Sequence, residues 1–250
     1  MRVVVLGAAG GLRTPRHALT ALLVNNCLLD CGYGTAIQLM KAGLMNNVEV
    51  VAITHFHPDH FAGLGELLWH YYLGERTERL EVIGPLGLRE KFKQLIAGWQ
   101  LSPEKIPFKI ILREVKPGDT VGNLKVGLAT HSIAPSLTFR LEEEGVSVFY
   151  SGDTQPSKEI VENAKNVDLL FYEATFPEGM KEEAYKVGHS TAEEAGLVAS
   201  RANAKTLFLV HLPYNKLGDE GSFVISFINS ALKNFKGPVL VPENLQVITL

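Results

Sequence analysis

Short apolar runs recur along the first half of the chain, and several of them end at glycine or asparagine. They are a few residues long and rich in valine, isoleucine and leucine, so they predict β-strands. Asn25-Asn26 separates two of the runs and predicts a hairpin, since asparagine tolerates positive φ. The predicted strands cover residues 3–6, 20–24, 27–30, 48–53, 81–83, 108–115 and 124–130.

Longer segments with apolar residues three or four positions apart predict amphipathic helices. Gly43 is expected to end the first helix, Gly84-Pro85 to end the strand at 81–83, and residues 102–107 to form a loop. The predicted helices cover residues 34–42, 61–73, 88–96, 191–202 and 223–235. Further strands are predicted at 137–141, 146–150, 168–172, 207–210, 239–241 and 245–250, with a second hairpin turn at Glu144-Gly145.

The two halves of the chain share one order of elements, strands followed by helices. No low-complexity stretch, charge block or proline-rich linker separates them. This order predicts an α/β protein in which two mixed sheets pack face to face, with helices on both outer faces. At 250 residues the chain is expected to form a single domain, residues 1–250.

Composition and charge exclude several classes of protein. A net charge of −3 gives no general attraction to nucleic acid or acidic membranes. No segment reaches the roughly 18 apolar residues of a membrane span, and the N-terminus turns into glycines too soon for a signal peptide, so a cytoplasmic protein is expected. Cys27 and Cys31 are too few for a disulfide framework or a four-cysteine zinc site, and we expect buried thiols.

A glycine-rich turn, residues 7–11, follows the first predicted strand. It contains no G-x-G-x-x-G pattern, and no helical pattern follows it. Dinucleotide-binding loops have this glycine pattern and are followed by a helix, so we do not expect a nucleotide site here.

The most informative stretch is residues 54–60, Thr-His-Phe-His-Pro-Asp-His. Side chains alternate along an extended chain, so His55 and His57 point the same way. Pro58 keeps His57 extended. Asp59 is then expected at the N-cap of the following helix and His60 in its first turn, facing a different point. Two ligand pairs that face two neighbouring points predict a site for two metal ions.

Three further candidate ligands each follow the C-terminal end of an apolar strand. His131 follows the strand 124–130, Asp153 follows 146–150 through Ser-Gly, and His211 follows 207–210. A lone histidine is more often structural than metal-binding. The joint pattern is stronger, because side chains at the ends of different strands can converge on one place.

With these residues the chain resembles the metallo-β-lactamase superfamily, whose metal set is H-x-H-x-D-H followed by a lone His, Asp and His. The resemblance implies a four-layer αββα sandwich with two Zn²⁺, or Mn²⁺ or another divalent ion, at one edge. A diiron redox member would carry Glu at position 57, and the commonest β-lactamases would carry Cys at position 153. In the implied arrangement the first metal takes His55, His57 and His131, the second takes Asp59, His60 and His211, and Asp153 bridges both.

Three local blocks resemble the ribonuclease Z branch of this superfamily. Residues 28–32 match its early Asp motif, with Asp30 near the metal loop. Residues 172–176, Tyr-Glu-Ala-Thr-Phe, match H-E-A-T-F except that Tyr172 replaces His, and 188–195 match the block around H-S-T. In that branch the histidine at the position of His189 contacts the scissile phosphate. The resemblance therefore implies catalytic roles for His189 and for Glu173 as its orienting partner. It also implies that Asp59 accepts the proton of the attacking water.

Structural roles for the same residues stay open. Glu173 could be a satisfied structural carboxylate, and His189 could be a neighbour of a helix N-cap. Of the remaining histidines, we expect His17 to border the cleft and His70 to be structural.

The substrate expectation depends on a missing segment. Ribonuclease Z enzymes carry a long tRNA-gripping arm between the lone His and the lone Asp. Here that interval covers 22 positions, with Arg140 as its single basic residue. We therefore expect a metal-bound hydroxide to cleave a small or cyclic phosphodiester. RNA is an unlikely but not excluded partner, and no membrane partner is expected. The formation of a homodimer stays open.

Alternative functions also stay open. One is tRNA 3′ processing, and another is hydrolysis of arylsulfates, thiolesters or lactones. A non-enzymatic alternative is a metal-bound ligand sensor.

Overall fold

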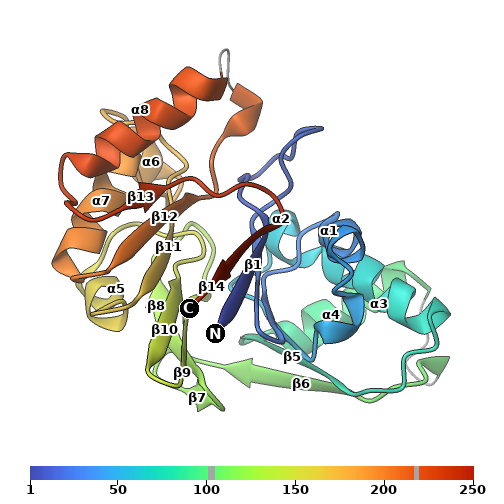
Figure 1. The fold of residues 1–250 in the computed structure, drawn as a ribbon. Coiled ribbons are helices and arrows are strands. Elements are labelled where there is room, and N and C mark those ends of the chain that lie inside the picture. The colour runs from blue at the N-terminus through green and yellow to red at the C-terminus, as the bar shows by residue number, and fades with distance from the viewer. Residues whose placement is uncertain (101–104, 217–219) are drawn as a thin grey trace.

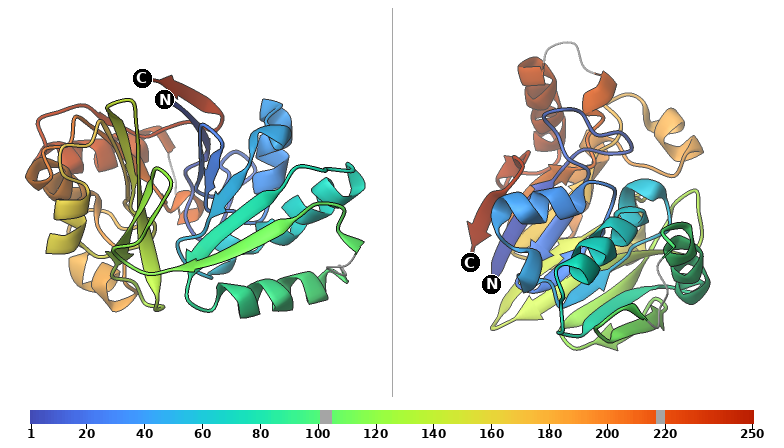
Figure 2. Two further views of the ribbon diagram at one scale, coloured as in Figure 1. Left: turned by 90° about the horizontal axis from the view of Figure 1, so that it is seen from below. Right: turned by 90° about the vertical axis from the view of Figure 1, so that its right-hand side faces the viewer.

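Two seven-stranded sheets face each other, with helices on both outer faces (Figure 1). The structure is a computed structural model that describes residues 1–100, 105–216 and 220–250, so residues 102–104 of the predicted loop lie outside it. The layers confirm the predicted αββα architecture, and the views of Figure 2 show the sheets side by side. That all 250 residues form a single domain stays a prediction.

The first sheet has the order β14-β1-β2-β3-β4-β5-β6. Its strands from β3 to β6 run parallel, and those on the other side of β3 are antiparallel. The strands are β1 (Arg2–Gly7), β2 (Ala21–Val24), β3 (Cys27–Leu29), β4 (Val50–Ala52), β5 (Leu80–Pro85), β6 (Ile110–Val115) and β14 (Gln246–Thr249). The helical elements of this half are α1 (Thr35–Ala42), a 3-10 turn (Met45–Asn47), α2 (Pro58–Phe61), α3 (Gly63–Leu73) and α4 (Leu88–Gly98).

The second sheet has the order β13-β12-β11-β10-β9-β8-β7. The strands are β7 (Thr120–Val121), β8 (Leu124–Ala129), β9 (Ser136–Glu143), β10 (Val146–Tyr150), β11 (Leu169–Glu173), β12 (Thr206–Val210) and β13 (Val239–Leu240). The helical elements are α5 (Lys158–Asn163), α6 (Lys181–Lys186), α7 (Ala192–Arg201), a 3-10 turn (Tyr214–Lys216) and α8 (Glu220–Leu232).

Three apolar layers result from the alternation of side chains along the strands. In β1, Val3 and Val5 face the other sheet, whereas Val4 and Leu6 face the helices. The same alternation in the second sheet places Phe139 between the sheets. The central strands, such as β1, β2 and β11, are therefore buried on both faces, which explains why they are continuous apolar runs in the sequence.

Both predicted hairpin turns occur with the expected backbone. Asn25 has φ 52° between β2 and β3, and Glu144 and Gly145 have φ 51° and 80° between β9 and β10. Positive φ at the first central residue, as at Asn25, or at both, as at Glu144-Gly145, is typical of the tight turns that join antiparallel strands. The β9–β10 hairpin fills most of the interval between positions 131 and 153.

Three predicted boundaries are wrong. The helix after the ligand loop starts at Pro58 with His57 as its N-cap, so Asp59 lies in the first turn instead of capping it; proline is well suited to the first helical position. Strand β5 continues through Gly84-Pro85, because β4 ends opposite Ile83 and leaves the last residues with one neighbouring strand, where proline is tolerated. The last helix runs over Glu220–Leu232 rather than 223–235.

Two short helices, α5 and α6, were not expected from the sequence. Each has six residues, too few for a clear apolar period. Ser157, which accepts the Ile160 N–H as the N-cap of α5, was the available signal. No helix within the described ranges combines the length and apolar character needed to cross a membrane.

The inner layer generates a testable stability difference. Phe139 is fully buried between the sheets, whereas Leu86 is 60% exposed. Phe139→Ala should lower the free energy of unfolding by about 3–5 kcal/mol, through lost burial and the cavity left behind. Leu86→Ala, the control, should change it by less than about 0.5 kcal/mol. Urea denaturation measures both, and equal losses would contradict the packing of this layer.

Candidate metal centre

Four strand ends from both sheets meet at one edge of the sandwich, and the seven predicted ligands follow them. Strand β4 leads into residues 54–60, β8 into His131, β10 into Asp153 and β12 into His211. The side chains form two groups, in each of which the ligand atoms lie within 4.8 Å of one another. The first group comprises His55, His57, His131 and Asp153, and the second comprises Asp59, His60, His211 and Asp153.

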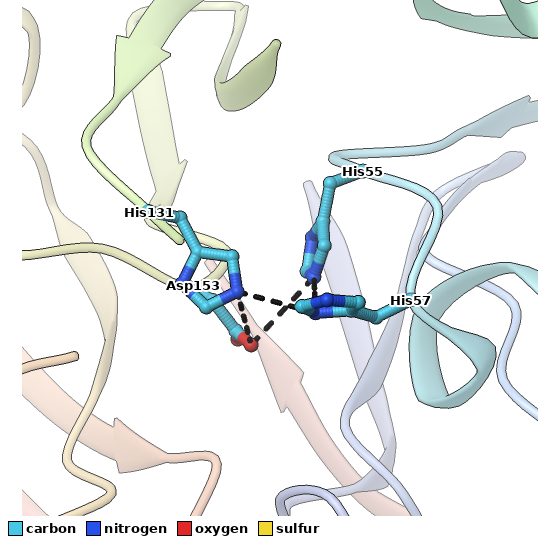
Figure 3. Close-up of side chains that lie close together, drawn as sticks. All are labelled: His55, His57, His131 and Asp153. Carbon is cyan, nitrogen blue, oxygen red and sulfur yellow. Dashed lines mark hydrogen bonds and ion pairs between the residues drawn. The ribbon is translucent and has the colours of Figure 1, made fainter. Parts of the chain in front are cut away.

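The first group gathers three imidazole nitrogens around one point (Figure 3). His57 Nδ1 lies 3.0 Å from His55 Nε2 and 3.2 Å from His131 Nε2. Asp153 Oδ2 closes the group, 3.7 Å from the His55 nitrogen and 3.9 Å from the His131 nitrogen. His57 therefore presents Nδ1 to the group, whereas the other two rings present Nε2.

The second group contains two carboxylates. Asp59 Oδ2 lies 3.3 Å from both His60 Nε2 and His211 Nε2. Asp153 Oδ1 also lies 3.3 Å from each of these nitrogens. One oxygen of Asp153 thus belongs to each group, and its carboxylate lies between the two.

These spacings fit a divalent cation in each group. Zinc binds nitrogen and oxygen ligands at about 2.0–2.2 Å with tetrahedral geometry, which separates neighbouring ligand atoms by about 3.3 Å. The edges of the second group have that length. In addition, His60 Nε2 and Asp153 Oδ1 are buried without a hydrogen-bond partner in the part of the chain that the structure describes. Such orphaned atoms are expected where an ion belongs.

Burial favours the neutral form of the imidazoles in the first group. It is the largest cause of the lowered pKa of His55, His57 and His131. Neutral imidazole is the form that binds a metal, so no proton has to leave these rings at neutral pH.

The second group is dominated by its carboxylates. Burial raises the pKa of Asp59, but the neighbouring imidazoles of His211 and His60 outweigh it and hold the pKa far below its usual value. Burial lowers the pKa of His60, but the Asp153 and Asp30 carboxylates outweigh it and raise the pKa well above its usual value. This negative field favours a positive charge in the second group.

The ring nitrogen that faces away from the ligand atoms is held in four of the histidines. Such contacts fix the tautomer in which Nε2 carries the lone pair, and they set the orientation of the ring. The four contacts are His55 Nδ1 with Thr54 Oγ1 at 3.0 Å, His60 Nδ1 with Asp30 Oδ2 at 2.7 Å, His131 Nδ1 with Gly188 O at 2.8 Å, and His211 Nδ1 with Thr175 Oγ1 at 2.8 Å.

Asp30 is the most connected of these partners. It is fully buried at the end of β3, and its φ of 60° turns the chain there. Its carboxylate accepts the Thr54 N–H at 2.7 Å, the Thr54 hydroxyl, the His60 Nδ1–H and the Tyr150 hydroxyl at 2.8 Å. Tyr150 belongs to the second sheet, so one carboxylate joins both sheets to the ligand loop.

The glycine-rich turn after β1 lies against the second group. A Cβ atom on Gly10 would lie 2.4 Å from His211 Nδ1, so only glycine fits there. The Gly11 N–H donates to Asp59 Oδ2 at 3.1 Å. The glycines thus allow the backbone to approach the candidate ligands, a role that the sequence left unassigned.

Glu173 and His189 form a buried pair beside the ligands. Glu173 Oε1 accepts from His189 Nδ1 at 2.8 Å and from the Thr154 N–H at 2.9 Å, and Oε2 accepts from the Thr175 hydroxyl at 2.8 Å. Burial lowers the pKa of His189, but the Glu173 carboxylate outweighs it and raises the pKa to about 9. The His189 ring lies 4.8 Å from that of His131, between centroids. The Glu173 carboxylate therefore favours the protonated form of His189 beside the ligand cluster.

The departure at Tyr172 lies away from the site. Strand alternation directs Glu173 toward the ligands and Tyr172 into the layer between the second sheet and its helices. There its hydroxyl lies 3.3 Å from Ser190 Oγ. The replacement of the resembled histidine by tyrosine therefore leaves the ligand cluster intact.

Thr175 is a site residue that the sequence analysis missed, although it lies in a block that was singled out. Its hydroxyl contacts both Glu173 and His211, so it links the Glu173–His189 pair to a candidate ligand. Short polar residues carry no spacing signal of their own, which is why it was passed over.

Other expected residues lie as follows. His17 stacks on Tyr214, with 3.7 Å between ring centroids, and lines a pocket near the cluster. His70 lies in α3 outside both ligand groups. Cys27 and Cys31 are free buried thiols, as predicted.

The Asp30 hub generates a testable difference between two variants. Asp30→Asn forces an amide NH₂ against a buried donor, so we expect the free energy of unfolding to fall by about 1–3 kcal/mol and zinc affinity to fall roughly 10–100-fold. Tyr150→Phe, the control, removes one donor and should cost about 1 kcal/mol. Urea denaturation and calorimetric zinc titration measure the effects. Equal losses of stability and of zinc affinity in the two variants would refute the role of Asp30.

Comparisons with known proteins identify the family of the chain. A family model described as the beta-lactamase superfamily domain matches residues 25–212. Ribonuclease Z of Ignicoccus hospitalis is 33% identical over 265 aligned positions, covering 84% of this chain and 87% of that protein. Ribonuclease Z of Methanosarcina acetivorans is 28% identical over 308 positions, covering 100% of this chain and 98% of that protein.

Solved structures with the same fold include two of similar extent. The short form of human tRNase Z superposes with a TM-score of 0.81 at 25% identity, covering 100% of this chain and 99% of that one. The metallo-beta-lactamase fold protein YhfI from Bacillus subtilis superposes with a TM-score of 0.83 at 24% identity, covering 99% and 98%. The chain belongs to the metallo-β-lactamase superfamily.

Proposed function

We propose that this metal-dependent hydrolase cleaves phosphodiester bonds with two divalent cations, zinc or manganese. His55, His57 and His131 would hold the first and Asp59, His60 and His211 the second. The observation that carries the proposal is the position of Asp153, whose two carboxylate oxygens belong to the two ligand groups. A carboxylate placed in this way is suited to bridge two ions.

The bound ions would supply two kinds of chemistry. Divalent cations lower the pKa of a coordinated water and neutralise phosphoryl oxygens. Two such ions carry four positive charges and Asp59 and Asp153 return two, so the site would be positive in a chain of net charge −3. A phosphate is therefore attracted to this edge of the sandwich rather than to the protein as a whole.

The residues of the chain have separate tasks in this scheme. His189, held by Glu173 through Nδ1, is left with Nε2 for the substrate. The Glu173 carboxylate raises the pKa of this ring and so favours its protonated form, which can stabilise developing charge or donate a proton to the leaving oxygen. Asp59 belongs to the second group and can also accept a proton from the attacking water.

The phosphodiester of an RNA strand is the first candidate substrate. The curated relatives reported above are named ribonuclease Z, and the Glu173–His189 pair that resembles that branch lies beside the ligands. This support places RNA ahead of the small or cyclic phosphodiester favoured by the sequence pattern.

A small phosphodiester is the second candidate, and a specific observation favours it. The Methanosarcina alignment runs over 308 positions against 250 residues here, so at least 58 positions of it have no counterpart in this chain. Between positions 131 and 153 the chain forms only the β9–β10 hairpin. A segment able to grip the body of a tRNA is absent from this described interval.

The bridging role of Asp153 can be tested by substitution. Asp153→Ala removes one ligand from each group, so we expect the bound metal to fall below two ions per chain and turnover of bis-p-nitrophenyl phosphate to be lost. Asp168→Ala is the control, because Asp168 lies at the far end of β11 from the cluster and binds Lys205. Elemental analysis gives the metal content. Full activity in Asp153→Ala would refute the two-metal proposal.

The role of His189 gives a separate prediction. His189→Ala should keep both ions and the fold, yet lower kcat by about 10²–10⁴-fold, the range typical of a general acid–base group. Steady-state kinetics and metal analysis on the same sample decide between roles. Loss of metal would instead make His189 a ligand, since Glu173, His189 and His211 also lie close enough to hold an ion.

The missing arm predicts how RNA length affects the reaction. A precursor tRNA and a short single strand with the same cleavage site should react with kcat/KM values within about tenfold of each other, because extra affinity requires additional phosphate contacts. Comparing the two at one salt concentration measures this. A precursor tRNA cleaved more than about a hundredfold faster would show that another surface grips its body. Turnover of small diesters alone would favour the second candidate.

A further inference from the structure

We propose that a cationic pocket beside the ligand cluster binds a second phosphate of a single-stranded nucleic-acid substrate. This inference rests on the proposed function and names its substrate class, a strand with at least two linked phosphates. The pocket has a volume of about 460 Å³, which lies in the range of small-ligand sites. It lies between the loop 13–18 and the segment that leads into α1, and its lining includes Arg13, Tyr33, Gln38 and Lys41.

Two hydrogen bonds of the Gly11 backbone connect the pocket with the second ligand group. The Tyr33 hydroxyl donates to Gly11 O at 3.3 Å, and the Gly11 N–H donates to Asp59 Oδ2. On the other side, the Cys31 N–H donates to His60 O at 2.7 Å, just before the chain enters the pocket wall. The same two segments therefore form the wall of the pocket and touch the candidate ligands.

The charge in the pocket is positive and only partly compensated. Arg16 and His17 face Glu220, with nitrogen–oxygen distances of 4.0 and 2.9 Å. Arg13 and Lys41 have no ion-pair partner within the described residues, and no described carboxylate lines the pocket. Two free cations that share one pocket beside a phosphate-cleaving centre are suited to a further phosphate.

An aromatic ring accompanies these cations. The Arg13 guanidinium lies 5.4 Å from the centroid of the Tyr33 ring, and Tyr33 is half-buried. Proteins that bind single strands combine cations along the backbone with aromatic rings on which bases stack. A cyclic mononucleotide has one phosphate, which would bind at the metal centre. Arg13 and Lys41 would then contact no phosphate. The pocket thus favours an oligonucleotide over a cyclic diester.

The separation of these residues in the sequence explains why the site was not foreseen. In the sequence, Arg13 and Arg16 lie far from Lys41 and form no basic cluster with it. In the folded chain Lys41, which lies 28 positions beyond Arg13, lines the same pocket. A pocket of about 460 Å³ is too small to replace an arm that grips the body of a tRNA.

The experiment compares the metal-loaded wild-type protein with Arg13→Gln and Lys41→Gln on two substrates. One is bis-p-nitrophenyl phosphate, which has a single phosphate, and the other is a single-stranded RNA of about five nucleotides. In each variant we expect the ratio of kcat/KM for RNA to that for the small diester to fall about tenfold or more. The slope of log kcat/KM for RNA against log salt should become shallower by about 0.7 per lost contact.

Matched variants control for the general loss of positive charge. Arg79→Gln and Lys91→Gln remove exposed cations outside the pocket and should keep the ratio and the salt slope of the wild type. Arg13→Lys keeps the charge and should retain most of the ratio. Ratios in Arg13→Gln and Lys41→Gln that match those of Arg79→Gln and Lys91→Gln would overturn the proposal.

A binding measurement separates this proposal from the proposed function. Fluorescence anisotropy of a labelled single-stranded DNA of the same length reports the grip without requiring cleavage. If the protein turned over neither substrate, the proposed function would fail, yet weaker binding by Arg13→Gln and Lys41→Gln would still support the pocket. Unchanged binding in both variants would overturn the pocket even in a fully active enzyme.

Discussion

The hydrogen bonds of the buried Asp30 carboxylate fix the geometry of the sandwich edge that carries the candidate ligands. Asp30 lies where β3 ends, accepts hydrogen bonds from the start of the ligand loop and from His60, and reaches Tyr150 of the other sheet. A buried charge is costly unless several donors meet it, so each of these groups has one low-energy position. Because Tyr150 comes three residues before Asp153, this contact also sets the distance between the candidate ligands of the two sheets.

The rest of the site follows the same plan, in which groups outside the ligand shell fix those inside it. Thr54, Gly188 and Thr175 each hold a ring nitrogen that faces away from the ligand atoms. Thr175 also contacts Glu173, so the position of His189 is tied to that of His211. Glycine at position 10 lets the backbone approach His211 closely. Such support explains how seven side chains from four strand ends can converge within a few ångströms.

The sequence could predict the parts of this site that depend on local geometry. H-x-H-x-D-H follows from side-chain alternation and one proline, and the lone His131, Asp153 and His211 were recognisable because each follows an apolar strand. The N-cap was assigned to Asp59 because capping statistics favour Asp, whereas Pro58 starts the helix one residue earlier. The metal-binding role of the seven residues stays a prediction, as does the single domain.

Features that depend on long-range contacts could not be predicted. Thr175 and Gly10 gain their roles only when β11, β12 and the turn after β1 meet. The pocket of Arg13 and Lys41 forms only when the loop after β1 packs beside α1. It gives a chain of net charge −3 a local positive surface next to its candidate metal centre, which the net charge alone does not reveal.

In the proposed reaction, two metal ions at this edge perform the hydrolysis. The most direct measurement is a zinc titration of chelator-treated protein, in which turnover of bis-p-nitrophenyl phosphate and bound zinc are followed together. Two ligand groups that share Asp153 predict that activity keeps rising with the second equivalent and stops at two ions per chain. Full activity at one ion per chain, or without bound metal, would contradict the account.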